Sequence, residues 1–180
     1  MYGMIHQAAR EMATELLGEA AWRDITAEAG LDEADLLAAR LHDDAKTLAL
    51  LRAVAARAGV SEAQALRALG QFWIGFASNS SYGSIMHMCG DRLDVFLRNL
   101  DRMHDSIQSA MPGARMPSFE IEETAPTHLR VAYYSDRTGL EPFVIGLFEG
   151  LLQKFGRAGE VRLVSTGAPS RFEIAYAEAA

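Results

Sequence analysis

The residues with the clearest chemical potential are a histidine on an apolar helix face and, further along the chain, three strong hydrogen-bond donors. Apolar side chains from Leu93 to Leu100 share one face of a predicted helix, and His104 follows Leu100 by four positions and precedes Ile107 by three. Its imidazole should therefore point toward the core. In an arbitrary helix, a core histidine bonded to a backbone carbonyl would be the better interpretation. A neutral imidazole in an apolar pocket is also what a haem iron requires of its proximal ligand.

The three donors are Tyr133, Ser135 and Arg137, which alternate along a predicted extended segment and should project to the same side. Two hydroxyls and a guanidinium can hold a pair of carboxylates, such as the two propionates of a haem. For any one of these residues, a solvated strand end is the simpler interpretation, but it explains the whole set poorly. Combined with His104, the donors predict a haem site.

The Tyr-x-Ser-x-Arg motif with an upstream histidine resembles the haem–nitric oxide/oxygen binding (H-NOX) family. That family includes the haem domain of soluble guanylate cyclase and sensors of bacterial signalling systems. The similarity runs nearly end to end, and the motif with its histidine is its most specific part. The supporting segments are residues 1–3, 43–47, 99–105, 112–119 and 139–147.

The resemblance implies haem b clamped between two lobes, with Ile5, Pro117 and Leu147 pressing on the porphyrin. It also implies that nitric oxide binding weakens or breaks the bond between His104 and iron, and that the lobes then shift. Carbon monoxide should bind in vitro. The signal would pass to a partner, either a histidine kinase or an enzyme of cyclic-di-GMP turnover, and the chain itself would not be an enzyme.

The expected distal side of the haem is apolar. Oxygen-binding members of the family carry a tyrosine in the helix after the motif, and alignment on residues 146–147 puts Phe143 at that position. Ile74 and Ala9 stand where those members carry further polar or aromatic side chains. Bound dioxygen needs a hydrogen-bond donor and nitric oxide does not, so these residues predict nitric oxide selectivity. Three polar residues could still reach the pocket and change this: Tyr2, His6 and Tyr82.

The composition is that of an ordinary globular protein, with 49% hydrophobic and 23% charged residues among 180. A net charge of −7 argues against nucleic acid or an anionic membrane as the main partner. The single cysteine, Cys89, excludes an intrachain disulfide and a cysteine-cluster zinc site, and fits a reducing cytoplasm. The first residues lack the pattern of a signal peptide, and the apolar runs are too short to span a bilayer.

The apolar spacing in the first half of the chain predicts helices. Helical spacing predicts a helix that ends at Gly18, a second one closed by Gly30, and a third around residues 36–41. Asp43 or Asp44 should cap the next helix, which ends before residue 59. Ser61 and Gln64 form a capping-box pattern that opens a longer helix. Residues 78–81 break it, and residues 111–113 stop the helix of His104.

Beyond residue 117 the apolar period changes from helical to alternating. Residues 119–121 and 129–133 predict two strands joined around 125–126, and residues 161–163 and 172–176 predict two more around 167–169. Residues 140–155 return to helical spacing. The layout is α+β, with a four-stranded antiparallel sheet. We expect one domain over residues 1–180, divided into a helical distal lobe, 1–60, and a lobe with the proximal helix and the sheet, 61–180.

Three other functions fit the sequence less well. An oxygen or redox sensor would use the same scaffold. A haem enzyme such as a peroxidase would need a distal acid–base pair, which is not evident. A cofactor-free interaction domain would leave the motif unexplained. His87 is flanked by Met86, Met88 and Cys89, but consecutive helical residues point in different directions and cannot converge on one metal.

Overall fold

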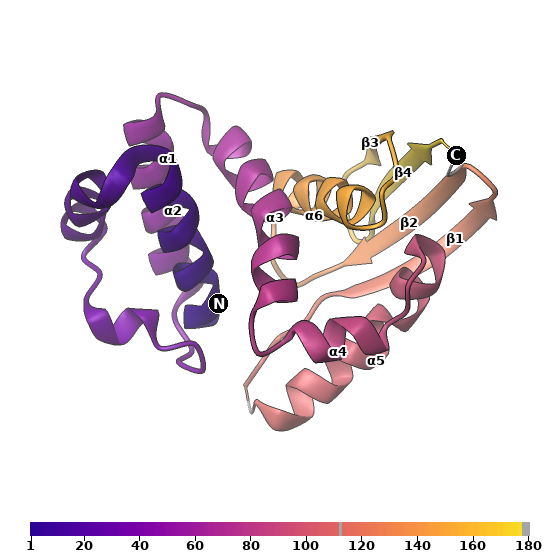
Figure 1. Cartoon of the computed structure of the whole chain (residues 1–180), viewed down its shortest axis with the longest axis horizontal. Helices are drawn as coiled ribbons and strands as arrows, with labels where there is room; N and C mark the ends of the chain where they lie inside the picture. Colours follow the sequence, from indigo (N-terminus) through magenta and orange to yellow (C-terminus); the bar gives the residue numbers. More distant parts are fainter. Residues whose placement is uncertain (112, 178–180) are drawn as a thin grey trace.

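The computed structural model describes residues 1–111 and 113–177. Figure 1 shows an N-terminal group of helices on one side and, on the other, a group of helices packed on a twisted sheet. The two groups are joined through a long helix, α3. Within the described residues, no helix is both long and apolar enough to cross a membrane.

The N-terminal group consists of α1 (Gly3–Ala29), the short 3-10 helix η1 (Glu33–Leu36) and α2 (Asp44–Ala58). α1 is kinked at Gly18, which has φ 86° and ψ 163°. A residue with a side chain rarely adopts such a φ, so Gly18 separates two helical arms. These arms are the two helices that the sequence predicted, and the break at Gly18 is confirmed as a kink.

The prediction of a full helix around residues 36–41 is wrong. Instead, a reciprocal capping box between Asp32 and Asp35 supports a single turn of 3-10 helix, η1, which ends at Leu36. The chain then runs beside the N-terminus, where the amide of Gly3 donates to the carbonyl of Arg40 at 2.8 Å and the amide of His42 donates to that of Met1 at 2.7 Å. These bonds satisfy backbone groups that a helix would otherwise have satisfied.

Both predicted helix starts after this segment are found. Asp43 caps α2 by accepting the amide of Ala45 at 2.9 Å. α3 (Glu62–Asn79) opens with the predicted capping box, in which the amide of Gln64 donates to the Ser61 hydroxyl at 3.2 Å and the amide of Ser61 donates to the Gln64 side chain at 2.9 Å. Each cap satisfies amides that the first helical turn leaves without a partner.

Three helices belong to the C-terminal group: α4 (Gly83–Met88), α5 (Leu93–Ala110) and α6 (Glu141–Lys154). α4 was not predicted, because its six residues are too few for a helical period to stand out. α5 carries His104 and buries the predicted apolar face, including Phe96 and Leu100. α6 lies between the second and third strands in the sequence, as its helical spacing indicated.

The sheet has four antiparallel strands in the order β1-β2-β4-β3. They are β1 (Ser118–Ala125), β2 (His128–Tyr134), β3 (Gly159–Ser165) and β4 (Ser170–Tyr176). The predicted α+β class and the four-stranded antiparallel sheet are therefore confirmed.

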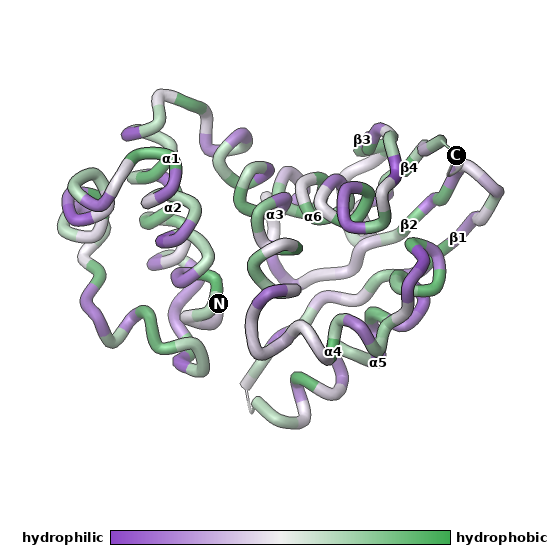
Figure 2. Tube along the Cα trace, in the orientation of Figure 1, coloured by the Kyte–Doolittle hydropathy of each residue, from purple (hydrophilic) through white to green (hydrophobic). Residues whose placement is uncertain are grey.

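Two hydrophobic cores hold the molecule together, and hydrophobic segments occur in both groups of elements (Figure 2). The first core joins the sheet to α5 and α6 around Phe96, Phe148 and Phe172. The second joins the N-terminal helices around Ile25 and Leu50, and it also includes Leu66 and Leu69 of α3. α3 thus contributes to both cores, while the division of the chain into lobes 1–60 and 61–180 stays a prediction.

α3 and α6 pack so closely that glycine is required at their contact. A Cβ on Gly70 would lie 3.0 Å from the Leu147 nitrogen and closer to the Phe143 oxygen, and a Cβ on Gly146 would lie 2.8 Å from the Gln71 nitrogen. Both values are below ordinary van der Waals contact. This close approach fixes the two helices that carry Ile74, Phe143 and Leu147.

Candidate haem site

A cavity of about 220 Å³ opens between the N-terminal segment, α3, α5, the end of β2 and α6. Its lining is mostly apolar and comes from both groups of elements. All nine residues selected from the sequence line it, although they lie far apart in the chain. Whether they contact a haem stays a prediction. The nine are Ile5, Ile74, His104, Pro117, Tyr133, Ser135, Arg137, Phe143 and Leu147.

His104 is held in the form that a metal ligand requires. Its Nδ1 lies 2.8 Å from the carbonyl oxygen of Pro117. A carbonyl can only accept, so Nδ1 carries the hydrogen and the lone pair of the neutral ring is on Nε2. Burial lowers the pKa of His104, against smaller opposing effects from the Pro117 bond and from Asp101 and Asp105, so the ring is neutral at pH 7. Within residues 1–111 and 113–177, the structure gives Nε2 no hydrogen-bond partner.

The hydrogen bond to the Pro117 carbonyl orients the imidazole of His104. A carbonyl that accepts a hydrogen bond from one ring nitrogen increases the basicity of the other nitrogen and fixes the ring direction. The donor chemistry of this site therefore fits a histidine that would bind haem iron. Pro117 both lines the cavity and supports the histidine.

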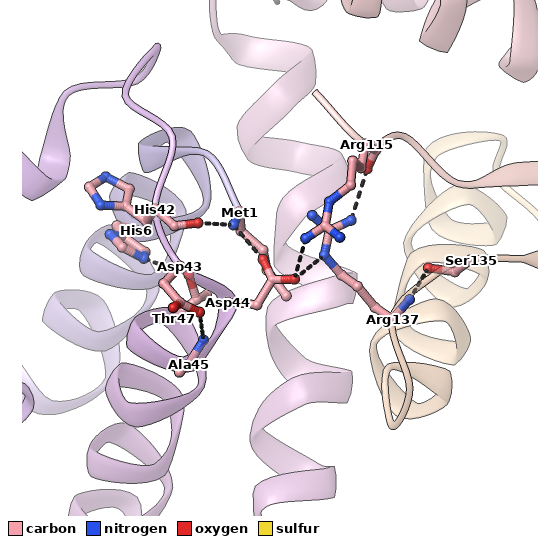
Figure 3. Close-up of polar contacts among 10 residues, drawn as sticks. All are labelled: Met1, His6, His42, Asp43, Asp44, Ala45, Thr47, Arg115, Ser135 and Arg137. Carbon is pink, nitrogen blue, oxygen red and sulfur yellow. Dashed lines mark hydrogen bonds and ion pairs between the residues drawn. The ribbon is translucent and has the colours of Figure 1, made fainter. Parts of the chain in front are cut away.

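The three predicted propionate contacts lie at the end of β2 and in the loop that follows. Tyr133 is buried, which raises its pKa, and a hydrogen bond with Ser135 opposes this effect. The hydroxyl of Ser135 accepts the amide of Arg137 at 3.1 Å. Arg137 extends across to the N-terminal group, where its Nε donates to Oδ2 of Asp44 at 2.7 Å (Figure 3). Its Nη1 donates to the carbonyl of Arg115 at 2.8 Å.

Asp44 does not cap α2, although the sequence allowed either Asp43 or Asp44 to do so. Its Oδ1 accepts the N-terminal ammonium of Met1 at 2.6 Å, while its Oδ2 is paired with Arg137 and lies 3.4 Å from Arg115. Burial would raise the pKa of Asp44, but the hydrogen bonds from the ammonium and from Arg137 outweigh this and lower it. One carboxylate thus faces three cations, and this excess of positive charge at the cavity rim suits two anionic propionates.

Of the polar residues that could have reached the cavity, Tyr2 and Tyr82 line it and His6 does not. The Tyr2 hydroxyl donates to the carbonyl of Met111 at 3.2 Å, at the end of α5. His6 is fully buried in the N-terminal group, with Nδ1 3.0 Å from the Asp35 carbonyl and Nε2 2.8 Å from the Thr47 hydroxyl. Ala9, in contrast to Ile74, lies in the N-terminal core rather than at the cavity.

Sequence reasoning missed the methionines around the cavity. Six of the eight methionines in the chain line it, and their flexible thioethers can adapt to the outline of a large flat group. They are scattered along the sequence, so no spacing pattern marked them. The six are Met1, Met4, Met86, Met103, Met111 and Met116.

The profile of a family described as Haem-NO-binding matches residues 2–163. The chain belongs to this family. It comprises haem-based gas sensors, and the resemblance noted from the Tyr-x-Ser-x-Arg motif is confirmed.

Curated relatives of the chain are soluble guanylate cyclases. The chain is 28% identical over 152 residues to soluble guanylate cyclase gcy-35 of Caenorhabditis elegans, which covers 82% of the chain and 22% of that protein. It is 32% identical over 90 residues to guanylate cyclase soluble subunit beta-2 of Rattus norvegicus, covering 50% of the chain and 13% of the relative. The chain spans less than a quarter of the length of these relatives.

Solved structures of H-NOX proteins share the fold. The H-NOX protein from S. oneidensis in the Fe(II)NO ligation state superposes with a TM-score of 0.87 at 16% identity, over 99% of this chain and all of the other. The Fe(II) unliganded H-NOX protein from K. algicida gives a TM-score of 0.77 at 20% identity, over 99% and 98% of the two chains. At these identities, the likeness establishes the α+β architecture alone.

Proposed function

We propose that the chain binds haem b in the cavity, with His104 as the iron ligand, and that it senses nitric oxide. One observation carries this proposal. The Pro117 carbonyl fixes the Nδ1–H form of a neutral, mostly buried imidazole, whose other nitrogen is left to bind a metal at an apolar cavity.

The remaining lining residues would hold the cofactor from its edges and faces. Tyr133, Ser135 and Arg137 would bind the propionates, supported by the surplus of positive charge at the rim. Ile5 and Leu147 would pack on the porphyrin together with Pro117. When bound, haem would supply a ferrous iron able to take up a small diatomic gas.

The apolar wall supports selectivity for nitric oxide, with carbon monoxide as a second ligand in vitro. Ile74, Phe143 and Leu147 line the cavity and contain no donor to stabilise bound dioxygen. Oxygen sensing is the second candidate, favoured by the presence of Tyr82 in the lining. A peroxidase-like activity has less support, because the described lining contains one histidine, His104, and no carboxylate to complete an acid–base pair.

We further propose that gas binding weakens or breaks the bond between His104 and iron and thereby shifts α5 relative to the N-terminal group. The hydroxyl of Tyr2 on the carbonyl of Met111 links these two parts directly. A signal requires such a two-state element, whose equilibrium the ligand biases. A histidine kinase or an enzyme of cyclic-di-GMP turnover would receive the signal. A cytoplasmic location agrees with the single free thiol of Cys89.

Absorption spectra of three purified proteins would test the proposal. The wild-type protein, expressed with haem supply, should show a ferrous Soret band that shifts with nitric oxide and not with air. His104→Ala should lose the pigment and regain it with added imidazole. His87→Ala, which alters an exposed histidine, is the matched control and should behave like the wild type. Retention of the pigment and an unchanged Soret band in His104→Ala, without imidazole, would refute the proposal.

The distal assignment needs its own variant. If Tyr82 stabilised bound dioxygen, the wild type would form a stable complex in air and Tyr82→Phe would lose it. The apolar wall instead predicts that neither protein forms one.

A further inference from the structure

The start of β1 is attached to the side of α5 through one carboxylate. Oδ1 of Asp101 accepts the amide of Phe119 at 2.8 Å, and Oδ2 accepts the hydroxyl of Ser118 at 2.5 Å. The residue immediately before these two is Pro117. Asp101 therefore fixes the position of the segment that presents the Pro117 carbonyl.

Asp101 precedes His104 by three positions on α5, so the two side chains lie on neighbouring positions of the same helix face. His104 donates through Nδ1 to the Pro117 carbonyl at 2.8 Å. The four residues from Asp101 to His104 and the three from Pro117 to Phe119 thus form a closed ring of hydrogen bonds. Neither end of this ring can move without straining the bond at the other end.

Asp101 is also the last side chain of α5 before His104 that is anchored outside the helix. Further along α5, the hydroxyls of Ser106 and Ser109 donate back to carbonyls of the same helix. In the described part of the chain, residues 105–110 make no other side-chain hydrogen bond or ion pair. Besides His104 itself, Asp101 is therefore the side chain through which the described part of α5 is bonded to the segment of the Pro117 carbonyl.

We propose that Asp101 is a positioning residue for His104, which it controls through Ser118, Phe119 and the Pro117 carbonyl. This inference rests on the proposed role of His104 as iron ligand. A well-aligned carbonyl on Nδ1–H makes Nε2 a stronger donor to the metal. If Asp101 is removed, the segment loosens, the hydrogen bond of His104 lengthens, and the bond from Nε2 to iron weakens.

Negative charge near the imidazole is the competing explanation. Both Asp101 and Asp105 raise the pKa of His104 through their charges. Asp105, the residue after His104, makes no side-chain hydrogen bond within the described residues. It is therefore a matched control, because its removal takes away a nearby charge and leaves the ring of hydrogen bonds intact.

The test is the iron–histidine stretching frequency of the ferrous haem protein, measured by resonance Raman spectroscopy, together with the rate of haem loss. Asp101→Ala should lower the frequency and accelerate haem loss roughly tenfold, the lower end of the usual effect of a supporting residue. Asp101→Asn should remain close to the wild type, since its amide oxygen can accept from Phe119 and its amide nitrogen can donate to Ser118. Asp105→Ala should leave the frequency unchanged.

An unchanged frequency in Asp101→Ala overturns the inference, and so does an equal shift in Asp105→Ala or in Asp101→Asn, because charge would then be the cause. If Asp101→Ala does not retain haem, Ser118→Ala removes one of the two bonds. It should give a smaller shift in the same direction, and no shift would again overturn the inference. A wild-type protein without haem would instead contradict the proposed function, so the two failures are distinguishable.

Discussion

Alanine substitutions at two glycines of the α3–α6 pair should change stability in opposite directions. A Cβ at Gly146 of α6 would lie 2.8 Å from the backbone nitrogen of Gln71 and closer still to the carbonyl oxygen of Arg67, both in α3. A Cβ at Gly75 of α3 would meet nothing within 4 Å. The two substitutions are chemically identical and both occur inside helices, so only the packing differs.

The magnitudes follow from this difference. To reach an ordinary contact of 3.4 Å, α6 must move at least 0.6 Å away from the Gln71 nitrogen (3.4 minus 2.8), and backbone atoms cannot rotate aside as side chains do. Overpacking costs about 1–3 kcal/mol, and this rigid contact places Gly146→Ala at about 3 kcal/mol. The better helix propensity of alanine returns about 1 kcal/mol, which leaves a net loss of about 2 kcal/mol. Gly75→Ala should gain about 1 kcal/mol.

Thermal unfolding of the haem-loaded proteins, followed by circular dichroism, measures both effects. For a chain of this length, about 2–4 °C per kcal/mol predicts that Tm falls by about 4–8 °C in Gly146→Ala and rises by about 2–4 °C in Gly75→Ala. Because Phe143 and Leu147 line the cavity on either side of Gly146, haem loss should also accelerate in that variant. A Tm of Gly146→Ala equal to that of the wild type would refute the packing argument, and so would a lower Tm in Gly75→Ala.

Two further predictions concern the charged groups. Arg137→Lys should accelerate haem loss about tenfold without abolishing binding, because lysine keeps the charge facing Asp44 and loses the planar fork of donors. The rate of haem transfer to an acceptor protein measures this effect, and Arg10→Lys, on the exposed side of α1, is the control. Equal rates in the two variants would contradict the role of Arg137 in binding the propionates. Burial lowers the pKa of His6 and His42 in the folded protein below 6.5, so the unfolded chain takes up protons first as the pH falls. The free energy of unfolding should therefore be highest above about pH 6.5 and should decrease below it. Urea midpoints measured between pH 5 and 7.5 should show this decrease in the wild type and a smaller decrease in His42→Asn. Wild-type midpoints that do not change with pH would disprove the prediction.

Much of the fold could be predicted from the sequence, because its signals are local. The capping box of Ser61 and Gln64, the break at Gly18 and the alternating residues of the strands each act within a few positions of the chain. The wrong helix prediction, by contrast, has a cause that is distant in the chain. Residues 36–41 have helical apolar spacing, but Leu37 and Leu41 are 60% and 50% exposed, and the backbone there is bonded to the N-terminal segment instead. Periodicity cannot reveal a partner of this kind.

For the site, the sequence identified residue types but not all of their partners. His104 and the three donors could be selected because a haem needs an imidazole and carboxylate-binding groups. The Pro117 carbonyl could not be assigned to His104, since backbone groups leave no mark in a sequence. The six cavity methionines gave no signal either, because any apolar residue could have occupied their positions.

The adjacent residues Asp43 and Asp44 show why pairing at long range escapes sequence reasoning. Either could have capped α2, and the backbone decides between them: Asp43 has an extended ψ of 136°, which turns its carboxylate back onto the first helical turn. Asp44 is already helical, so its side chain projects outward, where it meets Met1 and Arg137. Arg137 is 93 positions away in the chain. A one-residue shift of the helix start would exchange the two roles and remove the contact between the cavity rim and the N-terminal group, so the geometry of the rim depends on the cap of α2.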